Sequence, residues 1–397
     1  MAEPGTPPPN ALDHESPLDH AAYLDHAATT PVRPEAREAM LPWLGDRVGN
    51  PSGAHRLARD ARRALDDARD VFASVTGFEP GDIVFTAGGT EADSLAVNGV
   101  LDAVGGVAVC PATEHHAVLE AVESRDGRIV RVDPSGAVDL DHLASMLDDA
   151  VRLVSVMAVN NETGVIADVA AVVDLVRGEA PDALIHTDAV QALAWIDVPT
   201  VCAEVDLLSL SAHKFGGPQG VGLLAVRDGV PLRAQLLGGG QERGRRSGTQ
   251  NVAGVVGAAA AADVTAGTRI ESVGRLGRLR DRLADGLVAA VDDAVETAVS
   301  GGDRSGKIAG NCHLCLPGVE AEALLVLLED RDVYASAASS CSSGAQDPSH
   351  VLAAMDVPRS LAAGSLRLSL GWSSSDADID AALDAVPAAV ERLRVFS

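Results

Sequence analysis

Lysine is scarce in this chain, and one of its lysines occupies an unusual position. The chain has 31 basic residues, of which only Lys214 and Lys307 are lysines. Lys214 ends the segment LLSLSAHK, which starts as an apolar run and finishes in a short polar turn. Such a run predicts a buried strand with Lys214 at its end. A lysine that is partly withdrawn from water there can act as a Schiff-base nucleophile.

Two further segments place polar groups at the ends of expected strands. Asp188 follows the apolar stretch ALIHT, and in open α/β sheets ligands bind at the carboxyl edge of the strands. Gly88, Gly89 and Thr90 lie between a strand and an amphipathic helix, whose N-terminus favours anions. Singly, a helix N-cap explains Asp188 equally well, and an ordinary strand-to-helix turn explains the glycines. Together with Lys214 they match what pyridoxal phosphate requires: a lysine, a carboxylate for the ring nitrogen and a phosphate site.

Cys341 differs from the other cysteines in its neighbours. It lies in YASAASSCSSGAQDPSH, among small polar residues, whereas a free cysteine is usually buried among apolar side chains. We therefore predict an exposed, mobile thiol that can act as a nucleophile. Cys312 and Cys315 form a Cys-x-x-Cys pair, but the segment alternates like a strand and no second ligand pair accompanies it. A strand is favoured over a zinc or redox site, and no metal site is expected.

Two other polar segments have more than one explanation. One histidine of the pair His115 and His116 could stack on a cofactor ring or move protons near neutral pH, and the other is expected to be an ordinary loop residue. The segment GGGQERGRRSGTQN is a glycine-rich basic loop in an acidic protein. It is either a solvated turn or, through its arginines with Ser247 and Thr249, a phosphate-binding segment.

The composition limits the protein class. A net charge of −26 disfavours nucleic acids and anionic membranes as partners, because like charges repel. A hydrophobic content of 47% is typical of a globular protein, and no apolar run approaches the roughly 20 residues that span a bilayer. The N-terminal segment lacks the features of a secretory signal, and five cysteines are an odd number for a disulfide scaffold. We expect a cytoplasmic protein with free thiols.

The chain's elements should position these residues in an α/β fold. Residues 1–22 are polar and proline-rich and are expected to form a flexible tail. From residue 23 to about 270, short apolar runs alternate with helical segments, which predicts a large domain with a mainly parallel sheet. Residues 271–397 begin in a long helix, continue through mixed strands and helices and end in an acidic helix, which predicts a smaller α+β domain carrying the Cys341 segment.

A series of segments in chain order matches one family: YLDHAATTP, GNPSGAH, FTAGGTEADSLA, TEHHAVL, VNNETGV, HTDAVQA, SAHKFGGPQGVG, GGGQERGRRSGT, SSCSSGAQDPSHVL and SLRLSLG. The chain resembles the cysteine desulfurases of the NifS/IscS-like class from about Tyr23 to about residue 385. This resemblance implies the aspartate aminotransferase-like fold, which is fold type I of the pyridoxal phosphate enzymes.

The resemblance also implies a role for each matched residue. Lys214 would form the Schiff base with pyridoxal phosphate and move the Cα proton, Asp188 would pair with the ring nitrogen, and His115 would stack on the ring and take part in acid–base steps. Asn161 and Arg367 would receive the substrate carboxylate. The residues expected to hold the cofactor are Lys214, Gly89, Thr90, His115, Asp188, Gln191, Ser211, His213 and, from the other subunit of a homodimer, Thr249.

The resemblance further implies the reaction and the partners. L-Cysteine would yield L-alanine while its sulfur passes to Cys341 as a persulfide, and a cysteine loop of this length is typical of members that deliver the persulfide directly to an acceptor protein. Because a free thiol is only a few per cent ionised at neutral pH, we expect a nearby base or cation, with His115 as a candidate, to activate Cys341. Acceptors of such sulfur include iron–sulfur scaffolds, tRNA-thiolating enzymes, DNA phosphorothioation systems and thio-natural-product pathways.

Two alternatives to this function stay open. A selenocysteine lyase or another C–S lyase would use the same cofactor chemistry, and formation of alanine and sulfide from cysteine that depends on Cys341 separates them from a desulfurase. A non-catalytic scaffold protein could retain the fold, and purified protein without an absorption band near 400 nm would favour it.

Overall fold

The computed structural model describes residues 21–337 and 349–395. Its centre is a seven-stranded sheet, which confirms the expected α/β architecture. In spatial order the strands are β2 (Ile83–Thr86), β8 (Gly222–Val226), β7 (Leu207–Ser211), β6 (Leu184–Asp188), β5 (Val151–Ser155), β3 (Val107–Pro111) and β4 (Arg128–Val130).

The sheet is mainly parallel, as predicted, with one reversed strand. β8 runs antiparallel to both β2 and β7, whereas the other neighbours are parallel. The connection from β7 to β8 spans residues 212–221 and holds only a single short 3-10 turn, η2 (Ala212–Lys214). A parallel return requires a crossover of a dozen or more residues, so this short connection forces β8 to reverse. Hydrophobic periodicity carries no information about strand direction, so the reversed direction of β8 could not be predicted from the sequence.

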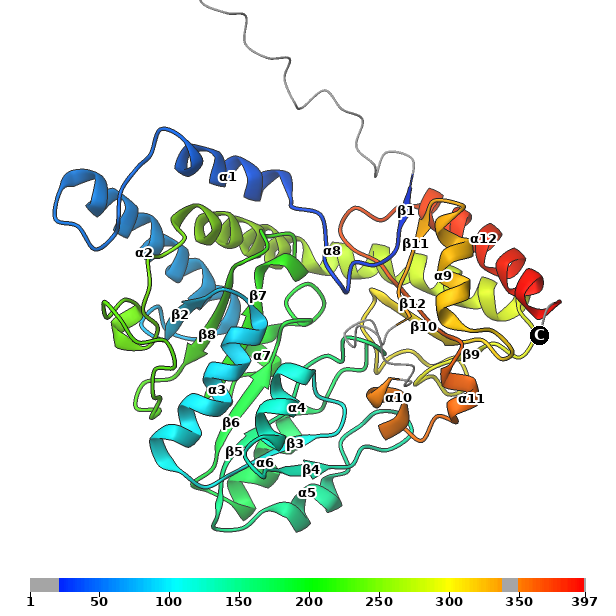
Figure 1. Cartoon of the computed structure of the whole chain (residues 1–397), viewed down its shortest axis with the longest axis horizontal. Helices are drawn as coiled ribbons and strands as arrows, with labels where there is room; N and C mark the ends of the chain where they lie inside the picture. Colours follow the sequence, from blue (N-terminus) through cyan, green and yellow to red (C-terminus); the bar gives the residue numbers. More distant parts are fainter. Residues whose placement is uncertain (1–20, 338–348, 396–397) are drawn as a thin grey trace, which may run out of the picture.

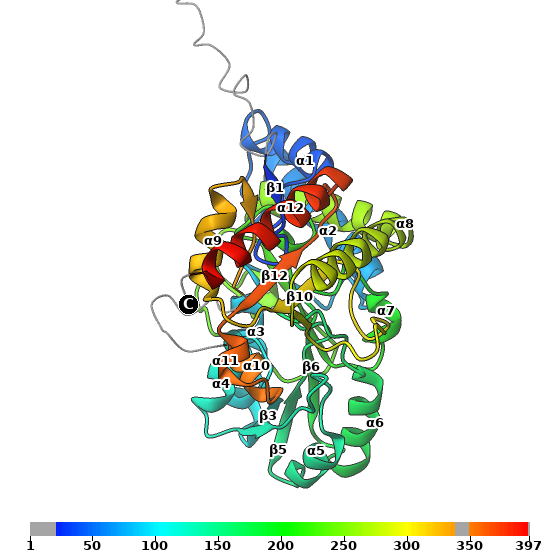
Figure 2. The same ribbon diagram turned by 90° about the vertical axis from the view of Figure 1, so that its right-hand side faces the viewer.

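Helices cover both faces of the sheet. On one face lie α3 (Gly89–Val104) and α4 (His116–Glu123), and on the other lie α2 (Arg56–Thr76), α6 (Val169–Glu179) and the first part of α8 (Val252–Ala290) (Figure 2). Alternate strand residues lie on opposite faces of the sheet. Leu207 packs in the hydrophobic cluster under α3, and Leu208 packs in the hydrophobic cluster on the other face. Burial on both faces explains the near-continuous apolar strands. The remaining helices of this part are α1 (Pro34–Leu44), α5 (Leu140–Met146) and α7 (Val198–Val201).

The rest of the described chain packs around a second hydrophobic core. One antiparallel sheet has the order β12 (Ser365–Ser369), β10 (Asn311–Cys315) and β9 (Val295–Glu296), and a parallel pair joins β1 (Ala22–Tyr23) to β11 (Val333–Tyr334). This core lies beside the carboxyl edge of the large sheet (Figure 1). The helices of this part are α9 (Ala321–Glu329), α10 (His350–Ala354), α11 (Arg359–Ala362) and α12 (Asp376–Arg394).

Helix α8 joins the two cores. It is one continuous helix of 39 residues, with Val255 in the large core and Leu283 in the small one. The expected division between residues 270 and 271 falls inside it (Figure 1), so the two cores are connected by a helix rather than by a flexible linker. Strand β1 begins at Ala22, the last residue of the expected tail, and residues 1–20 lie outside the described chain.

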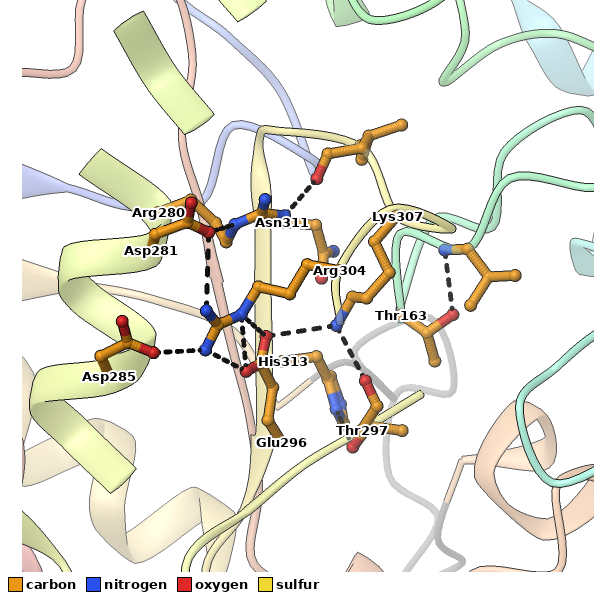
Figure 3. Close-up of polar contacts among 12 residues, drawn as sticks. Thr163, Arg280, Asp281, Asp285, Glu296, Thr297, Arg304, Lys307, Asn311 and His313 are labelled. Carbon is orange, nitrogen blue, oxygen red and sulfur yellow. Dashed lines mark hydrogen bonds and ion pairs between the residues drawn. The ribbon is translucent and has the colours of Figure 1, made fainter. Parts of the chain in front are cut away.

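A buried ionic cluster stabilises the smaller core. The Glu296 carboxylate accepts hydrogen bonds from the Arg304 guanidinium at 2.6 to 3.0 Å, and the Lys307 ammonium lies 3.8 Å from it. Lys307 Nζ also donates to the carbonyl of Thr297 at 2.8 Å (Figure 3). The Lys307 backbone forms a β-bridge with Val165 of the large part. The second lysine is therefore a buried structural residue that helps to join the two parts.

We expect Glu296→Gln to lower the free energy of unfolding by about 3 kcal/mol, because it leaves the buried Lys307 ammonium without its counter-charge and removes the buried partner of Arg304. Asp285→Asn is the matched control, since Asp285 also pairs with Arg304, at 2.8 Å, but its side chain is 70% exposed. That change should cost less than about 1 kcal/mol. Urea denaturation of the two variants measures the difference, and equal losses would show that the buried pair contributes no more than a surface pair.

Within residues 21–337 and 349–395, no helix has the length and apolar character needed to cross a membrane.

Candidate active site

A cavity of about 370 Å³ lies at the carboxyl edge of the parallel strands. Its walls come from the ends of β6 and β7, the first turn of α3, the N-cap of α4 and the segment before α1. The parallel strands bring these remote segments to one edge of the sheet, as expected for an α/β fold. The predicted site residues that line the cavity are Gly89, Thr90, His115, Asn161, Asp188, Gln191, Ser211, His213, Lys214 and Arg367.

Lys214 lies in η2, the short turn that follows β7. Its ammonium donates to the carbonyl oxygens of Ala27 at 2.6 Å and Ala28 at 2.8 Å. The Gln191 amide donates to the same Ala27 carbonyl at 2.8 Å. The N-terminal segment therefore holds the lysine amine at the cavity wall, where an incoming carbonyl group could reach it.

Asp188 is the last residue of β6 and is buried. Burial raises the pKa of its carboxyl to about 6, while the backbone N–H of Val190 and the charge of Lys214 act to lower that pKa. The Val190 N–H donates to Asp188 Oδ1 at 2.8 Å. Asp188 can therefore carry a negative charge at neutral pH within a low-dielectric site, as pairing with a protonated ring nitrogen requires.

The opposite end of the cavity is suited to an anion. Helix α3 begins at Gly89, so its unpaired backbone N–H groups lie at the cavity. A Cβ atom at Gly89 would lie 2.8 Å from a methyl carbon of Val190, which excludes a larger residue at this turn. The hydroxyls of Thr90 and Ser211 line the same end. A phosphate group would find backbone and hydroxyl donors there, and the residues of the cavity thus fit pyridoxal phosphate at both ends.

The two adjacent histidines have different environments. His115 lines the cavity, and its Nδ1 accepts from the backbone N–H of Ala117 as the N-cap of α4. Burial and the charge of Lys214 lower the pKa of His115 to about 4, so its ring is neutral and carries its proton on Nε2. His115 can therefore donate a hydrogen bond or a proton. The His116 ring packs instead against that of His350 in a tilted arrangement, with 4.4 Å between their centres.

Arg367 and Asn161 meet on the side of the cavity that faces the small core. Arg367 is 4% exposed, donates to the backbone oxygen of Asn161 at 3.0 Å and pairs with Asp25 at 2.8 Å. Its Nε has no hydrogen-bond partner among the described residues. A buried guanidinium with a spare donor is suited to binding a carboxylate.

Two predicted residues are not part of this cavity as the structure describes it. Thr249 is exposed and lies in a separate pocket that also includes Thr86, Glu242 and Arg246. Cys341 lies outside the described residues. The Cys312–Cys315 segment is strand β10, as predicted, with the two thiols in different apolar clusters. Across the described chain, no group of three or more potential ligands could hold a metal ion.

Sequence reasoning missed several polar residues of the site. Asp93 lines the cavity from the first turns of α3, Glu114 lies buried beside His115, and Asp25 is the partner of Arg367. A sequence signal existed for Asp93, since an acidic residue near the start of an otherwise apolar helix face interrupts that face. No such local signal connects Asp25 with Arg367, which lies 342 positions further along the chain.

A mostly parallel sheet that presents a lysine, a buried aspartate and a helix N-terminus around one cavity defines the class of pyridoxal phosphate enzymes with fold type I. The class-V aminotransferase model matches residues 22–382. The chain is 42% identical over 383 residues to the IscS-like cysteine desulfurase of Mycobacterium tuberculosis, covering 92% of this chain and 95% of that protein.

Solved structures agree with this match. A NifS-like protein superposes with a TM-score of 0.86 at 33% identity, covering 94% of this chain and 100% of its own. SspA in complex with cysteine superposes with a TM-score of 0.74 at 27% identity, covering 88% of this chain and 98% of its own. The chain belongs to the class-V aminotransferase family, among relatives named cysteine desulfurases, and this family depends on pyridoxal phosphate.

Proposed function

We propose that this protein is a cysteine desulfurase that converts L-cysteine to L-alanine and transfers the sulfur to an acceptor through Cys341. The observation that carries the proposal is the cavity in which Lys214, Asp188 and the N-terminus of α3 meet. The family match supports the same activity. The proposal assigns each wall of the cavity to one part of the reaction.

The cofactor would lie with its phosphate at Gly89, Thr90, Ser211 and His213 and its ring nitrogen at Asp188. Bound pyridoxal phosphate supplies an aldehyde for the amino group and an electron sink for the Cα electrons. Lys214 would anchor the cofactor through Nζ and then carry the proton removed from the substrate Cα. His115, with its proton on Nε2, would lie against the ring as a donor. Gln191 would contact the ring oxygen.

The substrate carboxylate would bind to Arg367 and Asn161. Arg367 is already oriented by Asp25 and the Asn161 backbone, so little reorganisation is needed when substrate binds. Its spare Nε supplies a donor for the incoming carboxylate. SspA, which was solved in complex with cysteine, has the same fold and supports cysteine as the substrate.

The sulfur step would require one thiolate from the protein. The Cys341 thiolate attacks the substrate Sγ, an S–S bond forms, and the Cβ–Sγ bond breaks. The electron pair of that bond stays on the carbon skeleton, which takes up a proton and leaves as alanine. The four described cysteines are buried and burial raises the pKa of each thiol, to about 12 for Cys202 and Cys312. Cys341 is therefore the cysteine that we assign to sulfur transfer.

A second copy of the chain and an acceptor protein would complete the system. The phosphate end of the cavity continues into a wider groove lined by residues such as Thr90, Ser211 and Gln219. We propose that Thr249 reaches this groove from the partner subunit of a homodimer. The persulfide would then pass to a sulfur-acceptor protein in the cytoplasm, where thiols stay reduced.

Reductive trapping of the cofactor tests the proposal directly. Borohydride treatment of the purified chain followed by peptide mapping should find the pyridoxyl group on Lys214, with Lys307 as the internal control. The same preparation should form alanine from L-cysteine and bind labelled sulfur on Cys341. Absence of the adduct from Lys214 would refute the cofactor assignment, and an adduct without alanine formation from cysteine would refute the substrate.

We expect Arg367→Lys to raise the KM for L-cysteine by about 10- to 100-fold, because a single ammonium replaces the planar fork of donors. Arg331→Lys is the control, since Arg331 forms an exposed pair with Asp384. Steady-state alanine formation measures both variants. A loss confined to kcat, with an unchanged KM, would contradict the assignment of Arg367 to the substrate carboxylate.

A further inference from the structure

The sheet face under α3 changes from apolar to polar as its strands approach the cavity. Residues 153, 184 and 207 of this face are leucines that pack in the α3 cluster. The next residues on the same face are polar and are at most 6% exposed. A buried polar layer is costly unless its groups bond to one another. Its members are Ser155, His186, Asp188, Ser209 and Ser211.

Asp93 covers this polar layer from α3. It is 1% exposed, its carboxyl group interacts with the Ser209 hydroxyl, and its Oδ1 lies 3.7 Å from His186 Nε2. The Ser209 hydroxyl is also 2.9 Å from His186 Nε2, and the Ser155 hydroxyl is 2.8 Å from His186 Nδ1. In the register of the sheet, Ser209 is the direct neighbour of Asp188. Asp93 therefore lies against the hydrogen-bonded pair His186 and Ser209, and Ser209 is the strand residue beside Asp188.

Glu114 is a second buried acidic residue, next to His115 in the chain. It is completely buried, and its Oε1 accepts from the backbone N–H of Met157 at 2.6 Å. Neither Glu114 Oε2 nor Asp93 Oδ1 has a hydrogen-bond partner among the described residues. A buried carboxylate oxygen without a donor is strongly disfavoured, whereas a protonated carboxyl supplies its own donor.

The charges around the cavity favour the protonated form for two of the three buried carboxyl groups Asp93, Glu114 and Asp188. The cations that line the cavity are Lys214 and Arg367, and Arg367 is paired with Asp25. Burial keeps His115, His186 and His213 neutral by lowering their pKa values to about 4, 3 and 4. The single positive charge of Lys214 cannot balance three carboxylates together with the phosphate that the site is proposed to receive.

We propose that Asp93 and Glu114 are positioning residues that keep their protons in the folded protein, so that Asp188 is the only charged carboxylate of the three. This inference rests on the proposed function for its purpose. When Asp93 and Glu114 are neutral, the negative charge of the three residues is concentrated on Asp188, the proposed partner of the ring nitrogen, and Asp93 and Glu114 do not repel the phosphate. Burial, and then the charge of Asp188, raise the pKa values of both side chains well above their ordinary values. Asp188 accepts a hydrogen bond from the backbone N–H of Val190 and also lies near Lys214. Within the described part of the chain, neither Asp93 nor Glu114 has both kinds of stabilising neighbour.

The pH dependence of unfolding tests the proton on Asp93. In the unfolded chain Asp93 would ionise above a pH of about 4, whereas the folded chain would retain the proton. The stability of the wild type should therefore fall with rising pH relative to Asp93→Asn. The ratio of their unfolding equilibrium constants, measured by urea denaturation of the full-length chain without cofactor, should rise about tenfold per pH unit between pH 5 and 7. Glu114→Gln should behave similarly.

Infrared spectroscopy provides a second measurement that does not depend on unfolding. At pH 7 the full-length wild type should show the C=O stretches of two protonated carboxyl groups. Asp93→Asn should lose one of them and retain that of Glu114, and Asp188→Asn should retain both. Loss of a carboxylate band in Asp93→Asn, or an unfolding ratio that does not change with pH, would overturn the proposal.

Pyridoxal phosphate binding, followed by absorbance, separates this inference from the proposed function. Asp93→Asn should retain at least tenfold higher affinity than Asp188→Asn, because only Asp188 loses a charge-assisted bond. Equal losses of affinity in both variants would refute the different roles. If the wild type failed to bind the cofactor, the proposed function would fail, while the infrared result on Asp93 would still stand.

Discussion

Replacement of Lys214 by alanine is expected to lower alanine formation from L-cysteine by about 10³-fold or more, since both the anchor of the cofactor and a proton carrier are removed. The structure supports a large effect, because the Lys214 amine has a fixed position against the Ala27 and Ala28 carbonyls. Steady-state and single-turnover assays of the purified variant measure the loss.

Lys214→Arg separates chemistry from charge in this experiment. Arginine retains the positive charge beside Asp188 but cannot form the covalent bond, so its activity should be as low as that of alanine. Lys307 cannot replace Lys214, because it is buried against Glu296 and Thr297 in the smaller core. An arginine variant with activity within tenfold of the wild type would show that Lys214 acts only through its charge.

Cys341→Ala should abolish sulfur transfer to an acceptor while leaving the cofactor absorbance unchanged, a loss of about 10³-fold or more. A protein thiolate is required for the sulfur step, and burial holds the four described cysteines in the protonated form. Labelled cysteine followed by non-reducing separation of the chain detects the bound sulfur, and amino-acid analysis detects the alanine.

Cys202→Ala is the matched control for this experiment. Cys202 is 1% exposed in the large core and lies outside the cavity lining. Its replacement removes one thiol without touching the site, so bound sulfur should persist at the wild-type level. Sulfur that remains on the Cys341→Ala variant would place the acceptor thiol elsewhere in the chain and would contradict the assignment.

Glu296 and Asp93 illustrate two uses of buried charge in this fold. Glu296 pairs with two cations, Arg304 and Lys307. Asp93 meets a serine, a neutral histidine and another acid, and is best stabilised as a carboxyl group. A buried acidic side chain thus stabilises the smaller core at Glu296 and forms part of the proposed cofactor site at Asp93. The neighbouring residues account for the difference.

The main strands and the positions of Lys214 and Asp188 at their ends could be predicted from sequence, because their signals are local. Lys214 and Asp188 each follow an apolar run, and the structure places both at the carboxyl end of the predicted strand. Gly77 caps the C-terminus of α2 in the left-handed conformation, which glycine adopts readily. Local spacing determines which face and which end of an element a residue occupies.

The tertiary structure decided which remote residues meet. It reversed β8, continued α8 through the expected domain boundary, and set Asp25 against Arg367 and Asp93 beside the polar layer under α3. The physical reason is that hydrophobic period assigns residues to a buried face without identifying the segment that will cover it. The types and order of the reactive residues follow from the sequence, whereas their charge states and partners arise only when packing excludes water and brings distant segments together.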